Sequence, residues 1–235
     1  MALIFIMLII VLLVLLLIIQ GVMVSKNAIR LPEANGSKEN IQNRKYSLLH
    51  IGESTVAGVG VDSIKSGLTY GILNHFFLNN FTQLDWQILG KNGAKISASL
   101  KMNSKLKNPD ILIVTFGVND TKGFTRKSQW IKSLHQCVNR FSGIKTQVYF
   151  TSVPPMHKFP LLPTPLRYLL GMKAKWLDNI LQKQCTLNNW VYIKPLINTG
   201  PAHMAEDGFH PGKKGYKIWG EAIANQILKL QCKQP

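Results

Sequence analysis

The stretch EDGFHPG, residues 206–212, places two residues that can exchange a proton, Asp207 and His210, three positions apart in a short turn. A carboxylate at this spacing can reach the Nδ1–H of the imidazole without help from distant segments, and that contact fixes the tautomer. Nε2 is then free to accept a proton from a hydroxyl group. A loop histidine beside a loop aspartate is also a common structural pair, so a nucleophile is needed before the turn indicates catalysis.

A candidate nucleophile follows the first apolar run of the polar region. In SLLHIGESTVAGVG, residues 47–60, the run breaks at Gly52 and Ser54 comes two residues later. A serine hydroxyl is inert alone and needs a base within hydrogen-bonding distance. A serine after a strand can also cap the next helix, and the two roles are compatible. The stretch is not the GxSxG motif of α/β-hydrolases, because Val56 replaces the second glycine.

Two further motifs could supply hydrogen-bond donors to a developing oxyanion. Asn119 in FGVND ends an apolar run, where a short amide side chain is either a turn former or a donor. The backbone N–H groups of Ser54 and of a glycine in GKNGAK, residues 90–95, would complete a hole with three donors. Glycine is favoured there because a side chain would block close approach of the backbone.

These motifs follow predicted strands in an alternating pattern of strands and helices. Strands are predicted at residues 46–51, 85–89, 111–116, 147–152 and 190–194, with helices near 66–79, 95–106, 126–142, 165–185 and 213–231. The alternation predicts an α/β fold in three layers around a five-stranded parallel sheet. In such sheets the functional residues gather at the carboxyl ends of the strands, where the motifs lie.

Taken together, the four motifs resemble those of the SGNH (GDSL-type) hydrolase superfamily. IGEST resembles its Ser block, GKNGAK its Gly block, GVND its GxND block and DGFHP its DxxH block, and the resemblance spans residues 46–231. It implies a flavodoxin-like sheet and a serine esterase or lipase-type hydrolase that works through an acyl-enzyme. It also implies Ser54 as nucleophile, His210 as base and Asp207 as its orienting partner. The oxyanion hole would consist of the Ser54 amide, Gly93 and Asn119, with Gly93 preferred over Gly90.

One residue departs from the pattern of the superfamily, and one histidine competes with His210. Glu53 stands where the family has Asp before the serine, so the hydrogen bonds of that carboxylate need to be established. A structural tie to the first turn is preferred for Glu53 over a second general acid. His203 is the rival of His210, because it is near the same turn in sequence. The histidines at positions 50, 75 and 135 fall within predicted strands or helices and are interpreted as structural or surface groups.

The N-terminus predicts a membrane anchor. Residues 1–24 contain one strongly polar side chain, Gln20, and a helix of that length would reach about 36 Å, enough to cross a bilayer core of about 30 Å. The basic n-region and cleavage site of a signal peptide are missing, so an uncleaved anchor is preferred. We therefore predict a transmembrane anchor at residues 1–25, a polar tether at 26–45 and the catalytic domain at 46–235. Basic residues follow the span and none precedes it, which favours a cytoplasmic domain over a periplasmic or extracellular one.

Composition limits the partners. The chain carries 28 basic and 11 acidic residues, a net charge of +17, all outside the span. For an anchored chain this charge favours an anionic membrane surface. Nucleic acid is not expected, because the aromatic residues do not interleave with the basic ones. No metal or cofactor is expected, and the three cysteines, Cys137, Cys185 and Cys232, form no CxxC motif.

A proline-rich stretch after the fourth strand is a candidate substrate wall. PPMHKFPLLPTPL, residues 154–166, includes the apolar residues Phe159, Leu161 and Leu162, which could either cover the core or bind an acyl chain. The binding interpretation predicts a medium-chain acyl ester, such as a lysophospholipid, as substrate. Two alternatives remain: an acyl or acetyl transferase or deacetylase acting on a cell-envelope glycan, and a catalytically silent membrane-bound binding module.

Overall fold

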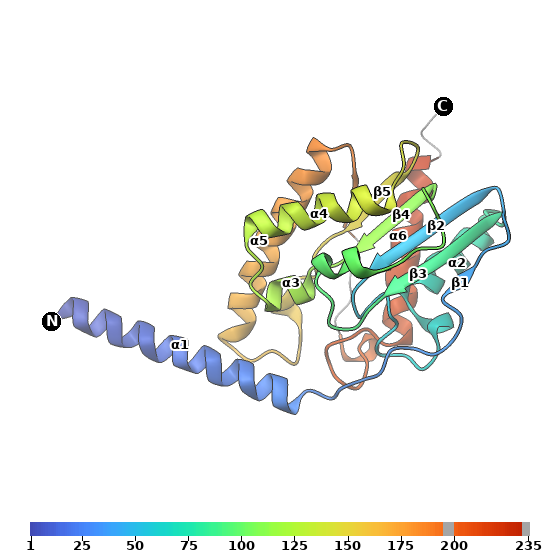
Figure 1. Ribbon diagram of the computed structural model, residues 1–235. Coiled ribbons are helices and arrows are strands. Elements are labelled where there is room, and N and C mark those ends of the chain that lie inside the picture. The colour runs from blue at the N-terminus through green and yellow to red at the C-terminus, as the bar shows by residue number, and fades with distance from the viewer. Residues whose placement is uncertain (195–199, 232–235) are drawn as a thin grey trace.

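The computed structural model describes residues 1–194 and 200–231, which form an α/β domain with a projecting N-terminal helix (Figure 1). The five predicted strands are present and parallel: β2 (Tyr46–Gly52), β3 (Leu84–Gly90), β4 (Ile111–Thr115), β5 (Gln147–Thr151) and β6 (Val191–Ile193). A short strand, β1 (Glu39–Asn40), pairs antiparallel with β3. The strand order is β1-β3-β2-β4-β5-β6. The prediction of a purely parallel, five-stranded sheet is therefore corrected to a mixed sheet of six strands.

The additional strand comes from the segment predicted as a polar tether. The buried Asp85 carboxylate accepts hydrogen bonds from the backbone N–H of Gln42 at 2.8 Å and of Arg44 at 3.1 Å. Ala34, further upstream, is buried. The polar composition of the segment gave no sign of this packing. The segment is held to β3 mainly by hydrogen bonds of its backbone rather than by apolar side chains.

Helices cover both faces of the sheet, as expected for three layers (Figure 1). The cluster on one face joins α2 (Leu68–Leu78) and α6 (Lys213–Gln231) to strand residues such as Leu48 and Ile113. The cluster on the other joins α4 (Lys127–Phe141) and α5 (Leu166–Leu187) to Leu49 and Val114. Side chains alternate between the faces along each strand, and because both faces are covered, all five residues of β4 are buried.

The shorter elements differ from the prediction in two places. The helix expected near 95–106 is a 3₁₀ helix, η2 (Ile96–Lys101), and the following chain is held by Gln87 Oε1, which accepts from the Ser104 hydroxyl and the Lys105 N–H. A short helix that was not predicted, α3 (Val118–Lys122), follows β4. The remaining 3₁₀ helices are η1 (Ile64–Ser66), η3 (Met156–Lys158) and η4 (Pro201–His203).

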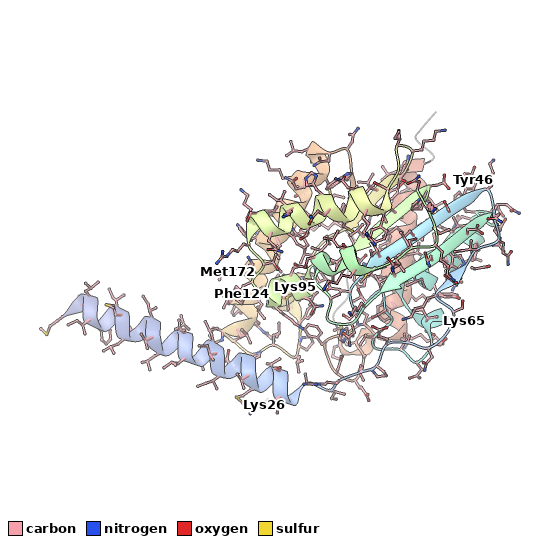
Figure 2. All side chains as sticks on the ribbon, in the orientation of Figure 1. Lys26, Tyr46, Lys65, Lys95, Phe124 and Met172 are labelled. Atoms are coloured by element: carbon pink, nitrogen blue, oxygen red, sulfur yellow. The ribbon has the colours of Figure 1, made fainter. Side chains whose placement is uncertain are left out.

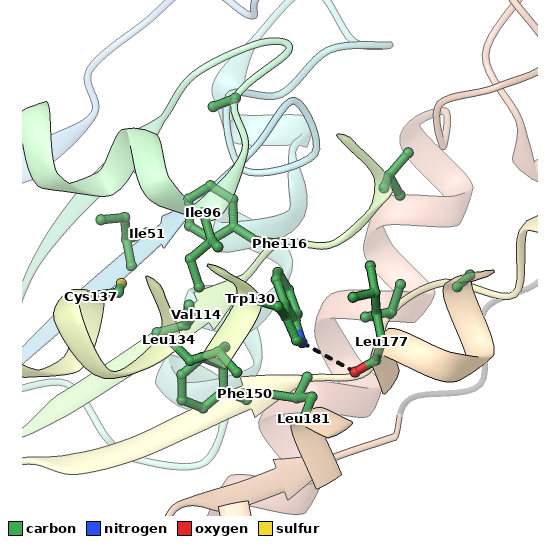
Figure 3. Close-up of a cluster of buried hydrophobic side chains, with 14 of the residues drawn as sticks. Ile51, Ile96, Val114, Phe116, Trp130, Leu134, Cys137, Phe150, Leu177 and Leu181 are labelled. Atoms are coloured by element: carbon green, nitrogen blue, oxygen red, sulfur yellow. Dashed lines mark hydrogen bonds between the residues drawn. The ribbon is translucent and has the colours of Figure 1, made fainter. Parts of the chain in front are cut away.

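The core beneath α4 and α5 is closely packed (Figure 3). Trp130 is fully buried there and its indole N–H donates to the Leu177 carbonyl oxygen at 3.2 Å, so its one polar group is satisfied. Cys137 and Cys185 are buried free thiols, and Cys232 lies outside the described residues. This core joins α4, which precedes β5, to α5, which follows the loop after β5.

The N-terminal helix, α1 (Ala2–Asn27), has no buried residue and is long and apolar enough to cross a membrane. At 1.5 Å per residue it measures about 39 Å. Its N-terminal half projects away from the domain (Figure 1), and its C-terminal half meets the start of α5, where Gln20 bonds to Thr164 and Leu166. The helix is therefore a candidate membrane span that also contacts the domain.

We predict that Leu134→Ala lowers the free energy of unfolding by about 2–5 kcal/mol, because Leu134 is fully buried on α4 and the core cannot close around the missing atoms. Leu187→Ala is the matched control. Leu187 is 66% exposed at the end of α5, so its loss should change stability by less than about 0.5 kcal/mol. Denaturant titration of both proteins measures the difference, and equal effects would contradict the core assignment.

Candidate active site

Three side chains from opposite ends of the domain form a continuous hydrogen-bonded chain. The Ser54 Oγ lies 2.9 Å from His210 Nε2, and His210 Nδ1 lies 2.6 Å from Asp207 Oδ2. Ser54 and Asp207 are each 5% exposed. This is the order of contacts through which an imidazole can take a proton from a hydroxyl while a carboxylate holds its other nitrogen.

Ser54 is positioned by the tight turn that follows β2. The Glu53 carbonyl oxygen accepts from the N–H of Val56 and of Ala57, so the chain bends sharply at the serine. A side chain at Gly52 would place its Cβ 2.3 Å from Val56 Cγ2, and one at Gly90 would place it 2.2 Å from the Ala57 nitrogen. The two glycines let β2 and β3 end directly against this turn. The Ser54 hydroxyl bonds to His210 rather than capping a helix.

Asp207 and His210 lie in the loop between η4 and α6. Hydrogen bonds within the loop itself hold much of its shape. The Asp207 Oδ1 accepts from the backbone N–H groups of Phe209 and His210, both at 2.9 Å, and Ala205 N–H donates to the His210 carbonyl at 2.8 Å. Burial alone would raise the pKa of Asp207, but the hydrogen bonds from His210 and Phe209 outweigh it and hold the pKa below its usual value. The carboxylate therefore stays charged beside the imidazole.

Glu53 connects the serine turn to Asn119. Its carboxylate is buried and accepts from the backbone N–H of Val118 at 2.9 Å and of Asn119 at 3.0 Å, the first residues of α3. The side-chain Nδ2 of Asn119 donates to the same carboxylate at 2.6 Å. Burial raises the pKa of Glu53 to about 7 despite these three donors. These contacts support the structural interpretation of Glu53.

Three N–H groups are available to an oxyanion beside Ser54. Within residues 1–194 and 200–231, no acceptor takes the backbone N–H of Ser54 or of Gly93. Asn119 Nδ2 uses one hydrogen on Glu53 and has a second. Gly93 has φ +72°, a conformation that favours glycine, and it lines the same cavity as Ser54 and Asn119. Gly90 packs against the Ala57 backbone and does not line the cavity, so the geometry favours Gly93 over Gly90 as the glycine donor.

A cavity of about 670 Å³ opens beside the serine. Leu161 and Leu162, predicted as substrate contacts, both line it, together with Ser54 and His210. Phe159 does not; it is buried beside a second, small cavity that also reaches Ser54 and His210, and its ring meets the Phe209 ring edge-on at 5.1 Å between centres. The cavity is therefore walled by part of the predicted stretch.

Among the described residues, His210 is the histidine that bonds to Ser54. His203 lines neither cavity. His50 is fully buried between the hydroxyls of Thr69 and Thr115, each at 2.9 Å, and burial lowers its pKa to about 3, so it is a neutral structural group. In the described ranges no cluster of three or more His, Cys, Asp or Glu side chains could hold a metal ion.

Sequence reasoning missed three groups that line the large cavity. They are Lys122, whose ammonium lies 5.2 Å from the centre of the Phe209 ring, Phe209 itself, and one face of α1. Phe209 occupies one of the two variable positions of the DxxH pattern, so the motif provided no signal for it. Gln20, the one strongly polar residue among residues 1–24, was the available signal for α1.

The raised pKa of Glu53 predicts a pH-dependent stability. The folded protein keeps this carboxyl protonated where the unfolded chain, with a pKa near 4.5, has lost the proton. The stabilisation is complete below about pH 4.5 and is lost as the pH rises through about 7, a total of about 3 kcal/mol. Glu53→Gln removes the titrating group. Wild-type stability measured relative to Glu53→Gln should therefore fall by that amount between pH 4.5 and 7.5, whereas a constant difference would contradict the prediction.

Solved structures of known proteins share this fold. The lipase/acylhydrolase from Enterococcus faecalis superimposes with a TM-score of 0.60 at 18% sequence identity, covering 79% of this chain and 96% of its own. The psychrotrophic esterase EstA from Pseudoalteromonas sp. gives 0.63 at 14% identity, covering 80% and 100%. Est24, a carbohydrate acetylesterase from Sinorhizobium meliloti, gives 0.53 at 15% identity, covering 79% and 100%. At these identities the likeness shows the fold. No curated protein sequence matches the chain.

The sequence profile of the GDSL-like Lipase/Acylhydrolase family matches residues 50–218, which is well over half of the chain. The matched region contains the GEST, GKNGAK, GVND and DGFHP motifs. It therefore includes every residue of the hydrogen-bonded chain and of the donor group beside it. The fold, the motifs and the profile agree, and the chain belongs to the GDSL-like lipase/acylhydrolase family of enzymes that hydrolyse ester bonds.

Proposed function

We propose that the protein is a membrane-anchored serine esterase that cleaves medium-chain acyl esters through Ser54, His210 and Asp207. The observation that carries the proposal is the 2.9 Å contact between Ser54 Oγ and His210 Nε2 at the end of an apolar cavity. A silent binding module would have no need for a hydroxyl held against an imidazole whose other nitrogen is fixed by a carboxylate.

In the proposed mechanism, Ser54 Oγ attacks the ester carbonyl carbon while its proton passes to His210 Nε2. The oxyanion receives hydrogen bonds from the N–H of Ser54, the N–H of Gly93 and Asn119 Nδ2. The bond to the leaving alcohol then breaks, and His210 gives its proton to the alcohol oxygen. Water attacks the acyl-enzyme with His210 again as base, the acid leaves, and the proton returns to Ser54. Asp207 orients the imidazole and stabilises its charged form.

The cavity supports an acyl chain as the group transferred to Ser54. Its walls are largely aliphatic, from Leu161 and Leu162 to Leu166 and Leu170 at the start of α5. Its volume of about 670 Å³ falls within the range of about 300–1,000 Å³ usual for ligand sites and far exceeds the needs of an acetyl group. Burial of each methylene contributes about 0.8 kcal/mol, so longer chains should bind more tightly.

Positive charge at the cavity supports an anionic head group, as in a lysophospholipid. Arg30 and Lys122 both line it, and neither forms an ion pair with any residue that the structure describes. We propose that α1 remains as a single-pass anchor, since it lines the cavity and a cleaved signal would leave that wall open. The cytoplasmic side stays a prediction from charge distribution.

Fluorophosphonate labelling tests the catalytic assignment. We expect a covalent adduct on Ser54, located by mass spectrometry, and a loss of ester turnover of about 10⁴-fold or more in Ser54→Ala and His210→Ala, because each removes a group that acts in every step. His203→Ala is the matched control and should retain wild-type turnover. An active Ser54→Ala protein, or an adduct on another serine, would exclude the mechanism.

A series of p-nitrophenyl esters tests the chain length. We expect kcat/KM to rise from acetate to octanoate, because each added methylene is buried against the aliphatic wall. A steady fall along the series would instead favour an acetyl-removing enzyme, like the carbohydrate acetylesterase among the structural neighbours. A product that appears only when an acceptor alcohol is added would identify a transferase.

A further inference from the structure

We propose that α1 is a wall of the acyl-chain pocket as well as an anchor, and that the enzyme takes membrane amphiphiles laterally from the bilayer between α1 and the start of α5. This inference rests on the proposed function. It assigns the N-terminal span a direct part in substrate selection.

One face of α1 lines the cavity. The α1 residues that line it have the three- and four-residue spacing that places side chains on one side of a helix: Val14, Leu17, Ile18, Gly21, Val24 and Ser25. Ala28, directly after the helix, continues the lining. Of these, Gly21 opens directly onto free space, since a Cβ built there meets no heavy atom within 4 Å. The same cavity reaches Ser54 and His210, so the helix face and the catalytic serine share one continuous space.

Gln20 fixes this face against the domain. Its Nε2 donates to the Thr164 carbonyl oxygen at 2.7 Å, and its Oε1 accepts from the Leu166 N–H at 3.1 Å. Leu166 begins α5, so this bond satisfies one of the N–H groups left without a partner in the first turn of a helix. An unpaired amide is costly in an apolar surrounding, and both the Nε2 and the Oε1 of Gln20 are paired.

The surface on the side toward which α1 projects suits the membrane interface. Four large apolar or aromatic side chains there are between 41% and 65% exposed: Phe124, Tyr168, Met172 and Trp176. The last three share one face of α5, and the Lys173 ammonium lies 3.9 Å from the Trp176 ring centre. In Figure 2, Phe124 and Met172 lie on the side of the domain toward which α1 projects, whereas Tyr46 and Lys65 lie on the opposite side. Exposed aromatic residues with basic neighbours are typical of membrane interfaces.

These observations place the cavity where α1 meets the bilayer surface. The lining positions occupy the C-terminal half of the span, next to the polar chain that leaves the membrane. An acyl chain that extends from Ser54 along α1 therefore remains in contact with apolar groups over its whole length. A substrate of this kind need not leave the bilayer completely, which avoids exposing its tail to water. The occupant that fits is a single-chain or short-chain membrane amphiphile with its ester at the interface.

The test fills the pocket from the α1 side in the full-length protein, reconstituted in phosphatidylcholine vesicles. Gly21→Phe projects a ring into the cavity, whereas Val22→Phe adds the same ring one position along, at a residue that is 48% exposed and does not line the cavity. With vesicle-borne p-nitrophenyl dodecanoate, Gly21→Phe should lower kcat/KM by about tenfold or more, and Val22→Phe by less than about twofold. With water-soluble p-nitrophenyl acetate, Val22→Phe should stay within about twofold of wild type, and the loss in Gly21→Phe should be much smaller than its loss with dodecanoate.

A second matched pair of variants repeats the test in case Gly21→Phe fails to fold. Ile18→Trp and Ile19→Trp make the same change on neighbouring positions, and of the two only Ile18 lines the cavity. The dodecanoate defect should appear in Ile18→Trp alone. Gln20→Leu should raise KM for dodecanoate without changing kcat for acetate, because it releases the helix face while leaving the catalytic groups intact.

The possible outcomes separate this inference from the function on which it rests. Equal dodecanoate rates within both pairs, together with turnover that depends on Ser54, would show that α1 is an anchor only. An absence of Ser54-dependent turnover with either ester would instead overturn the proposed esterase. A dodecanoate-specific defect confined to Gly21→Phe and Ile18→Trp would establish the helix as part of the substrate site.

Discussion

The hydrogen bond between Ser54 and His210 joins residues 156 positions apart, and the rest of the domain is arranged so that it can form. A parallel sheet places the end of β2 and the loop before α6 on the same side of the domain, at the carboxyl ends of the strands. Gly60 lets that loop approach closely, since a Cβ there would lie 2.5 Å from the Pro211 carbonyl oxygen. The Tyr216 hydroxyl donates to the Val59 carbonyl at 2.5 Å, which ties α6 to the turn after the serine. The site therefore depends on packing between the two ends of the domain.

Glu53 extends this arrangement to the oxyanion side. It is adjacent to Ser54 in sequence and bonds to both the backbone and the side chain of Asn119, so it links the turn that carries Ser54 to the Asn119 amide. A buried carboxyl is costly, and its raised pKa shows that the three N–H donors offset only part of the burial. The buried Glu53 lowers the stability of the folded domain at neutral pH, but its hydrogen bonds hold Asn119 in one position. Such a cost is common where the residues of a site must keep one geometry.

The N-terminal helix connects location with specificity. An anchor alone would hold the domain near the bilayer without constraining which face meets it. The two hydrogen bonds of Gln20 add that constraint, because they hold one face of α1 along the cavity that contains Ser54. The exposed aromatic face of α5 then lies on the same side as the span. In the arrangement that we propose, the membrane both retains the enzyme and presents the ester to it.

The sequence by itself determined the five parallel strands, the four motifs and the residues of the hydrogen-bonded chain. These are local signals: apolar runs, glycines at turns, and the Asp207–His210 spacing that a single loop can realise. Only the tertiary structure decided the pairing of β1, the partners of Glu53, the place of Phe159 and the packing of α1 against the cavity. Each of these depends on contacts between segments far apart in the chain. Periodicity shows that an element has an apolar face, but it does not show which distant surface that face will cover.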